Sequence, residues 1–102
     1  MTPKKNRSLK TLRIEAIQLR LRAMHSQLTS ASNFCSTAEN ALIAGRLQLG
    51  LDAVERAKHT VQRVRTHLEE PNHVPADSVA GIRDRLVELE KQISELEVRL
   101  RL

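Results

Sequence analysis

Apolar side chains recur every three or four residues from Ile14 to Gly45, and this repeat is the most regular feature of the chain. Alternating steps of three and four place apolar side chains along one side of a helix that packs on another helix. The side chains are long up to Leu28 and mostly small after it, so the second half of this helix is expected to have a close neighbour. The positions of the repeat are Ile14, Ile17, Leu21, Met24, Leu28, Ala31, Cys35, Ala38, Leu42 and Gly45.

Two further repeats with the same spacing follow, at Leu47, Gly50, Val54, Ala57, Val61, Val64 and Leu68, and at Val79, Ile82, Leu86, Leu89, Ile93, Leu96 and Leu100. We therefore expect three helices, at about residues 8–44, 46–70 and 75–101. Ser8 suits the N-cap of the first helix, and Gly45 suits the left-handed residue that ends it. Pro71 and Pro75 separate the second helix from the third.

Short connections make consecutive helices antiparallel neighbours, and the three repeats fit this arrangement. When Cys35 faces Ala57, Leu28 faces Val64, and in the same way Val61 faces Leu89. The predicted fold is therefore all-α, a three-helix antiparallel coiled-coil-like bundle with a long, projecting first helix. Residues 8–102 are expected to form one domain, preceded by a flexible basic tail at residues 1–7.

Two details of this bundle depend on weaker signals. Residues 29–33 have low helix propensity, which leaves open a break in the first helix near Ser30. Beside the core positions, Lys58 is expected to meet Glu90, whereas Arg65 would lie near Arg83.

The first helix is longer than its partner, because the second helix ends where Leu68 meets Met24. About 15 residues should therefore project beyond the bundle, over about 22 Å at the helical rise. This segment carries a second apolar stripe at Leu9, Leu12, Ala16, Leu19 and Ala23. Two apolar sides without a partner in the chain predict an interface with a partner or a second copy, made of Leu9, Leu12, Ile14, Ala16, Ile17, Leu19 and Leu21.

Basic residues concentrate at the same end of the chain. Of the net charge of +5, residues 1–25 carry seven Lys or Arg against Glu15, whereas residues 26–102 carry ten basic and eleven acidic groups. This distribution suggests an alternative function in nucleic-acid binding. Its contacts would be Lys4, Lys5, Arg7, Lys10, Arg13 and Arg20. A membrane role is not expected, because Arg13 and Arg20 fall between the two apolar stripes.

The remaining composition argues against enzymatic chemistry. With Cys35 alone, the chain can form no internal disulfide and no cysteine-based metal site. The four histidines lack the spacing of a helical metal pair, and no catalytic constellation is recognisable. We expect no metal, no cofactor and no small-molecule substrate. No run approaches the roughly 20 apolar residues of a membrane span, and a cytoplasmic protein is expected.

The sequence thus predicts a non-enzymatic, small helical interaction or assembly protein. It would self-associate, as a homodimer, or dock another helical protein through its N-terminal helix. The alternative is a nucleic-acid-associated protein that uses the basic N-terminus.

Overall fold

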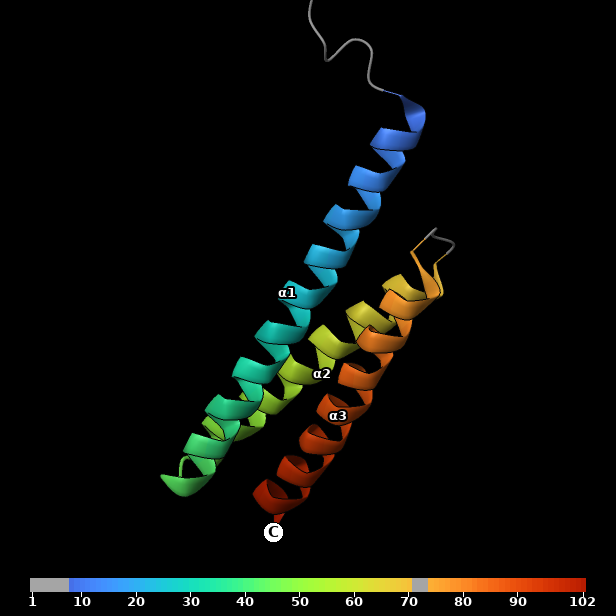
Figure 1. Cartoon of the computed structure of the whole chain (residues 1–102). Helices are drawn as coiled ribbons and strands as arrows, with labels where there is room; N and C mark the ends of the chain where they lie inside the picture. The colour runs from blue at the N-terminus through green and yellow to red at the C-terminus, as the bar shows by residue number, and fades with distance from the viewer. Residues whose placement is uncertain (1–7, 71–73) are drawn as a thin grey trace, which may run out of the picture.

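The computed structural model describes residues 8–70 and 74–102, which form three α-helices. These are α1 (Leu9–Ile43), α2 (Leu47–Glu69) and α3 (Ala76–Arg101). They pack side by side in alternating directions, and α1 extends well beyond the other two, in a molecule of 64 × 27 × 16 Å (Figure 1). The predicted all-α three-helix bundle with a long first helix is therefore confirmed. The basic tail at residues 1–7 lies outside the described residues.

Helix α1 runs without a break through residues 29–33, the segment of low helix propensity. Ser8 caps its start, because the Ser8 Oγ accepts a hydrogen bond from the Thr11 N–H at 3.1 Å. Farther along, the Thr29 hydroxyl donates to the His25 carbonyl at 3.0 Å. The hydroxyl therefore has a partner inside the helix. Burial of Leu28, Ala31 and Cys35 on the other side holds this polar stretch against the bundle.

The turn from α1 to α2 is closed by Gly45, whose φ of +73° is the left-handed conformation that glycine adopts without steric cost. The Arg46 N–H bonds to the Ala41 carbonyl at 2.8 Å, and the Gly45 N–H bonds to the Leu42 carbonyl at 3.2 Å. These two bonds form a Schellman motif, which satisfies carbonyls at the end of α1. The chain therefore reverses within a few residues and places α2 directly against α1.

The core follows the three repeats. From α1 it takes Met24 and Leu28 and then only small side chains, while α3 supplies large ones throughout. The helices approach closely at Gly50 of α2, where an added Cβ would lie 2.7 Å from Leu100 Cδ2 and 3.5 Å from Ala41 Cβ. Small residues on α1 and α2 thus make room for the leucines and isoleucines of α3.

Two ion pairs join α2 to α3, and they correct the expected charge contacts. Lys58 pairs with Glu97, not Glu90, and Arg65 pairs with Glu90 through two hydrogen bonds. Each of these residues directly follows a core position on its helix, and such positions share one edge of an antiparallel pair. The hydrogen bond from Lys58 lowers the pKa of Glu97, and the same contact raises the pKa of Lys58. Arg65 therefore does not lie opposite another arginine.

Candidate interaction surface

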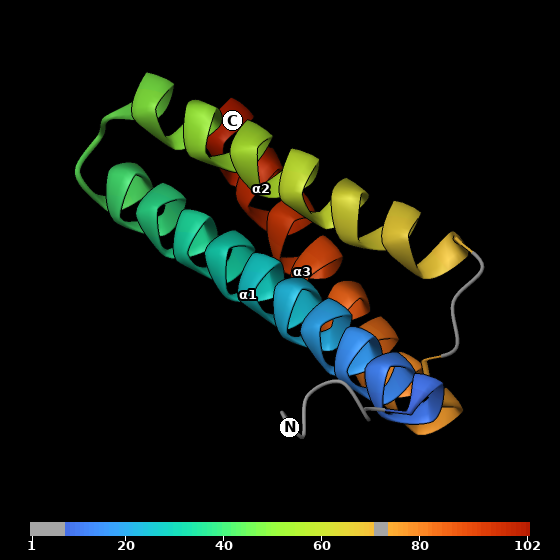
Figure 2. The ribbon, with the colours of Figure 1, turned by 90° about the horizontal axis from the view of Figure 1, so that it is seen from above.

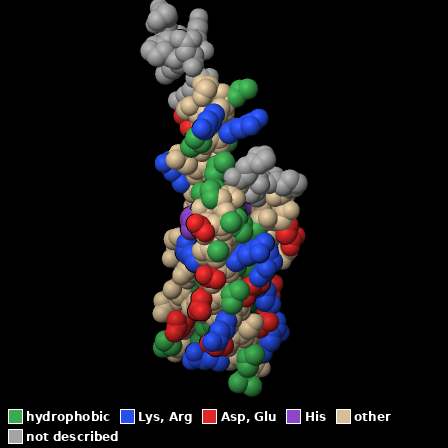
Figure 3. Space-filling view, turned by 45° about the vertical axis from the view of Figure 1, so that its right-hand side comes forward, with side chains coloured by type: hydrophobic (Ala, Val, Ile, Leu, Met, Phe, Trp, Pro, Cys, Tyr) green, Lys and Arg blue, Asp and Glu red, His purple; other side chains and the backbone are tan. Residues whose placement is uncertain are grey.

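The projecting segment, residues 9–23 of α1, is the part of the molecule that suits a partner. Helix α2 ends at Glu69, and the next residue, Glu70, lines a hollow together with Met24 of α1. Helix α1 continues beyond the bundle on its own (Figure 1). In the space-filling view this segment is a narrow column that carries apolar and basic side chains, whereas most acidic side chains on that face lie on the thicker part below (Figure 3).

The second apolar stripe is exposed at its leucines. Leu9 is 73% exposed and Leu19 is 64% exposed, and Leu12 and Ala16 are exposed as well. Large apolar side chains gain roughly 1.5–3 kcal/mol each when they are fully buried. This stripe therefore offers a substantial favourable free energy to any helix that covers it.

The apolar repeat that begins at Ile14 forms a first stripe, and this stripe is more buried in the projecting segment than the sequence predicts. Ile14 is exposed, but Ile17 is half-buried, and Leu21 packs against the buried core. The apolar packing therefore continues about one turn past Met24 toward the N-terminus. The sequence predicts that it stops at Met24, where the second helix ends. Of the seven predicted interface residues, Leu9, Leu12, Ile14, Ala16 and Leu19 are the exposed ones.

A hollow lies where the projecting segment leaves α2. It has a volume of about 410 Å³ and is lined by Ala16, Leu19, Arg20, Ala23 and Met24 of α1 and by His67 and Glu70 at the end of α2. The second stripe therefore runs into a concave site, and a helix that follows the stripe would meet the end of α2.

The basic residues of the projecting segment point in different directions. Lys10, Arg13, Arg20 and Arg22 are all exposed. On a helical wheel Arg13 and Arg20 fall between the two apolar stripes, and Arg22 falls on the opposite side. No ion pair between described residues involves any of these four. The other predicted nucleic-acid contacts, Lys4, Lys5 and Arg7, lie outside the described residues.

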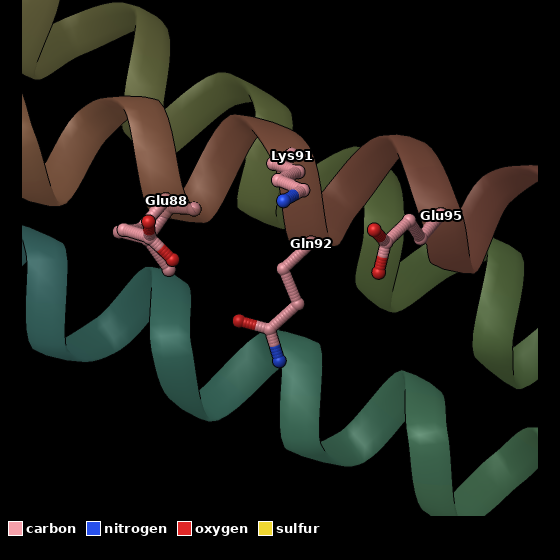
Figure 4. A pocket seen from close by; sticks show the side chains of 5 residues that line it. Glu88, Lys91, Gln92 and Glu95 are labelled. Atoms are coloured by element: carbon pink, nitrogen blue, oxygen red, sulfur yellow. The ribbon is translucent and has the colours of Figure 1, made fainter.

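A second surface, which the sequence reasoning missed, is a groove along α3 that reaches α1 at Ser32 and carries three acidic and two basic side chains. Two hollows of about 300 and 310 Å³ share Glu88 and Leu89. One also contains Lys91, Gln92 and Glu95 of α3, and the other contains Asp84 and Arg85 of α3 with Ser32 of α1. In Figure 4 the side chain of Gln92 extends from α3 toward α1, with Glu88 and Glu95 on either side along α3. The signal in the sequence is the spacing of Asp77, Asp84, Glu88 and Glu95, which lie in one row on a helix.

The residues that could carry metal or thiol chemistry are scattered or inaccessible. Within residues 8–70 and 74–102, no group of three or more His, Cys, Asp or Glu side chains could hold a metal ion. Cys35 is 1% exposed, as the sequence predicts, and burial raises the pKa of its thiol. A thiol that is buried and protonated is a poor nucleophile. His25 instead makes a structural contact, at 3.1 Å between its Nδ1 and Nη1 of Arg85 on α3.

Comparisons with known proteins give no relative: no family model matches the chain, and no curated protein or solved structure matches it. None of the helices in the described ranges has the length and apolar character needed to cross a membrane. The projecting segment and the groove along α3 are therefore the two features that bear on function.

Proposed function

We propose that this chain is a non-enzymatic interaction or assembly protein that uses the projecting segment to associate with a helix, from a second copy or from another helical protein. The observation that carries this proposal is the exposure of Leu9, Leu12, Ile14 and Leu19 on a helix that leaves its own bundle. Isolated helices of this length are marginal in water. A covering partner would stabilise the segment and bury its leucines.

A two-fold dimer is the simplest form of this proposal, because most soluble homo-oligomers have closed symmetry. The test is the mass in solution, measured by light scattering from about 5 to 300 µM. The double variant Leu12→Asp with Leu19→Asp should convert a dimer into a folded monomer, because buried unpaired carboxylates are costly. Far-UV circular dichroism should show that the three-helix part remains helical.

The control is Leu47→Asp with Leu49→Asp, which places the same chemical change on two exposed leucines at the start of α2. Asp in the first turn of a helix is electrostatically favourable, so the bundle should tolerate it. This control should leave the mass unchanged. A wild-type chain that stays monomeric at 300 µM would exclude self-association and leave another helical protein as the partner.

Nucleic-acid binding is the second candidate, favoured by the exposure of Lys10, Arg13 and Arg20 on the projecting segment. Phosphate contacts weaken steeply with salt, whereas an apolar helix interface does not. Binding to a duplex and to a single strand should be measured between 50 and 300 mM salt. Deletion of residues 1–7 should reduce the salt slope if this function is correct, and no binding at 50 mM salt would exclude it.

A further inference from the structure

The second apolar stripe of the projecting segment is complementary to a second copy of itself. Leucine and alanine alternate along it at Leu12, Ala16, Leu19 and Ala23. When two stripes pack antiparallel with Leu12 of one copy against Ala23 of the other, Leu19 comes against Ala16. Each layer then joins a large side chain to a small one, as close packing requires. The next position of the stripe is the polar Ser26, so the apolar stripe ends where this pairing ends.

The charges on one edge of the stripe fit the same register. On a helical wheel Glu15 and Arg22 share this edge, seven residues apart. In the antiparallel pair Glu15 of each copy comes beside Arg22 of the other, which gives two symmetry-related contacts between opposite charges. A shift of one heptad in either direction would bring Glu15 beside Glu15 or Arg22 beside Arg22. Charge therefore favours the register in which Leu12 meets Ala23.

The other edge carries Arg13 and Arg20, and the end of α2 supplies an opposite charge there. Glu70 lines the junction hollow together with Arg20 and Ala23, so its carboxylate lies on this edge of the stripe. Helix α2 and the segment of the second copy both run antiparallel to α1. Arg13 of the second copy, one residue after the Leu12 that meets Ala23, therefore comes close to the level of Glu70. The hollow receives that Leu12 and offsets the repulsion between the two arginines.

We propose that two copies associate through their projecting segments as an antiparallel pair, in which Leu12 of each copy enters the hollow at the end of α2 of the other. This inference rests on the proposed self-association and names its surface and register. The pair is closed, with a two-fold axis between the levels of Ala16 and Leu19. The two bundles lie at opposite ends of the pair, so they do not obstruct each other.

The first experiment is disulfide formation between two single-cysteine variants, Leu12→Cys and Ala23→Cys, mixed in a glutathione redox buffer at a concentration where the wild type is dimeric. The disulfide between the two different variants should dominate, because the two positions face each other. Disulfides between like variants should be rare, since two residues 11 positions apart differ in level by about 16 Å. Cys35 is 1% exposed, so the wild type should form none.

Two controls show whether this disulfide depends on the stripe. Leu19→Asp added to both variants should abolish it, because the charge would be buried in the pair. Leu49→Cys, at an exposed leucine of α2 far from the projecting segment, should form no disulfide with the Leu12→Cys chain.

The second experiment exchanges the charges of one edge, with the dimer dissociation constant measured by sedimentation equilibrium in 50 mM salt. Glu15→Arg and Arg22→Glu should each weaken the dimer about tenfold, because each removes two contacts and brings like charges together. The chain that carries both changes should regain most of the affinity. Glu39→Arg, an exposed change on α1 within the bundle, should leave the dissociation constant unchanged.

The outcomes separate this inference from the proposal on which it rests. A dimer in which like variants form the disulfides would be parallel, and it would overturn the register while keeping self-association. No recovery in the double charge variant would overturn the register as well, provided that circular dichroism shows each variant folded. A monomeric wild-type chain would overturn both.

Discussion

The two halves of α1 belong to one continuous helix, yet they differ in side-chain size and in burial. From residue 29 onward the core positions are small, and Ala31, Cys35 and Ala38 are almost completely buried. Before residue 24 the apolar positions are mostly large, and Leu9 and Leu19 are exposed. The same three-and-four repeat therefore serves two purposes. Small side chains allow α2 and α3 to approach, whereas large ones are left for a surface that the described part of the chain does not provide.

The two halves should differ most in how much a shortened leucine lowers the free energy of unfolding. Leu28→Ala removes a side chain with 0% exposure and should lower the free energy of unfolding by about 2–5 kcal/mol. Leu19→Ala, at a position 64% exposed, should change it by less than about 0.5 kcal/mol. Urea unfolding at low micromolar concentration measures both. Equal losses would mean that the projecting segment is packed within the monomer.

Enlarging an alanine in each half should give a smaller difference of the same kind. Ala38→Leu forces a large side chain into a position with 0% exposure, beside α2, and should destabilise by about 1–3 kcal/mol. Ala16→Leu adds the same atoms at an exposed position and should be nearly neutral for the isolated chain. Thermal unfolding of the two variants in parallel checks this. A neutral Ala38→Leu would mean that α1 and α2 are not closely packed.

The bundle could be predicted from the sequence because the apolar repeats, the turn residues and the facing positions all indicate the same fold. The repeats fix which positions are buried, and the contact of Gly50 with Leu100 fits the predicted register in which Val61 faces Leu89. A shift of the register would place large residues where Gly50 now leaves room. Packing therefore specifies the register strongly.

The contacts between surface side chains were harder to predict, because a long side chain can reach several partners. Lys58 contacts Glu97 and not Glu90, because Lys58 and Glu97 each directly follow a core position and so lie on the same edge of the pair of α2 and α3. The groove along α3 could not be predicted for another reason. It reaches α1 at Ser32, and the repeats give facing positions only for consecutive helices. Contacts between α1 and α3, such as His25 with Arg85, depend on how the third helix closes the bundle.

The smallest expected effect concerns pH and belongs to the bundle alone, since every ion pair between described residues joins residues of α2, its C-cap Glu70 and α3. The hydrogen bond from Lys58 lowers the pKa of Glu97 in the folded state below its value in the unfolded chain. The folded state therefore binds this proton less tightly than the unfolded state. The pair's contribution is complete above the unfolded pKa of about 4.3 and is lost as the pH falls through the lowered folded pKa.

Glu97→Gln removes this contribution. It should lower the free energy of unfolding by up to about 1 kcal/mol at pH 7, because both side chains of the pair are partly exposed to solvent. The difference from the wild type should shrink below about pH 4 and vanish near pH 2, where the wild-type carboxyl is protonated as well. Urea midpoints at pH 7, 4 and 2 measure it. Glu39→Gln, an exposed change on α1 at a residue without an ion pair among the described residues, should show no such dependence. If the two variants lose stability equally at pH 7, the contact between Lys58 and Glu97 contributes nothing specific to the packing of α2 on α3.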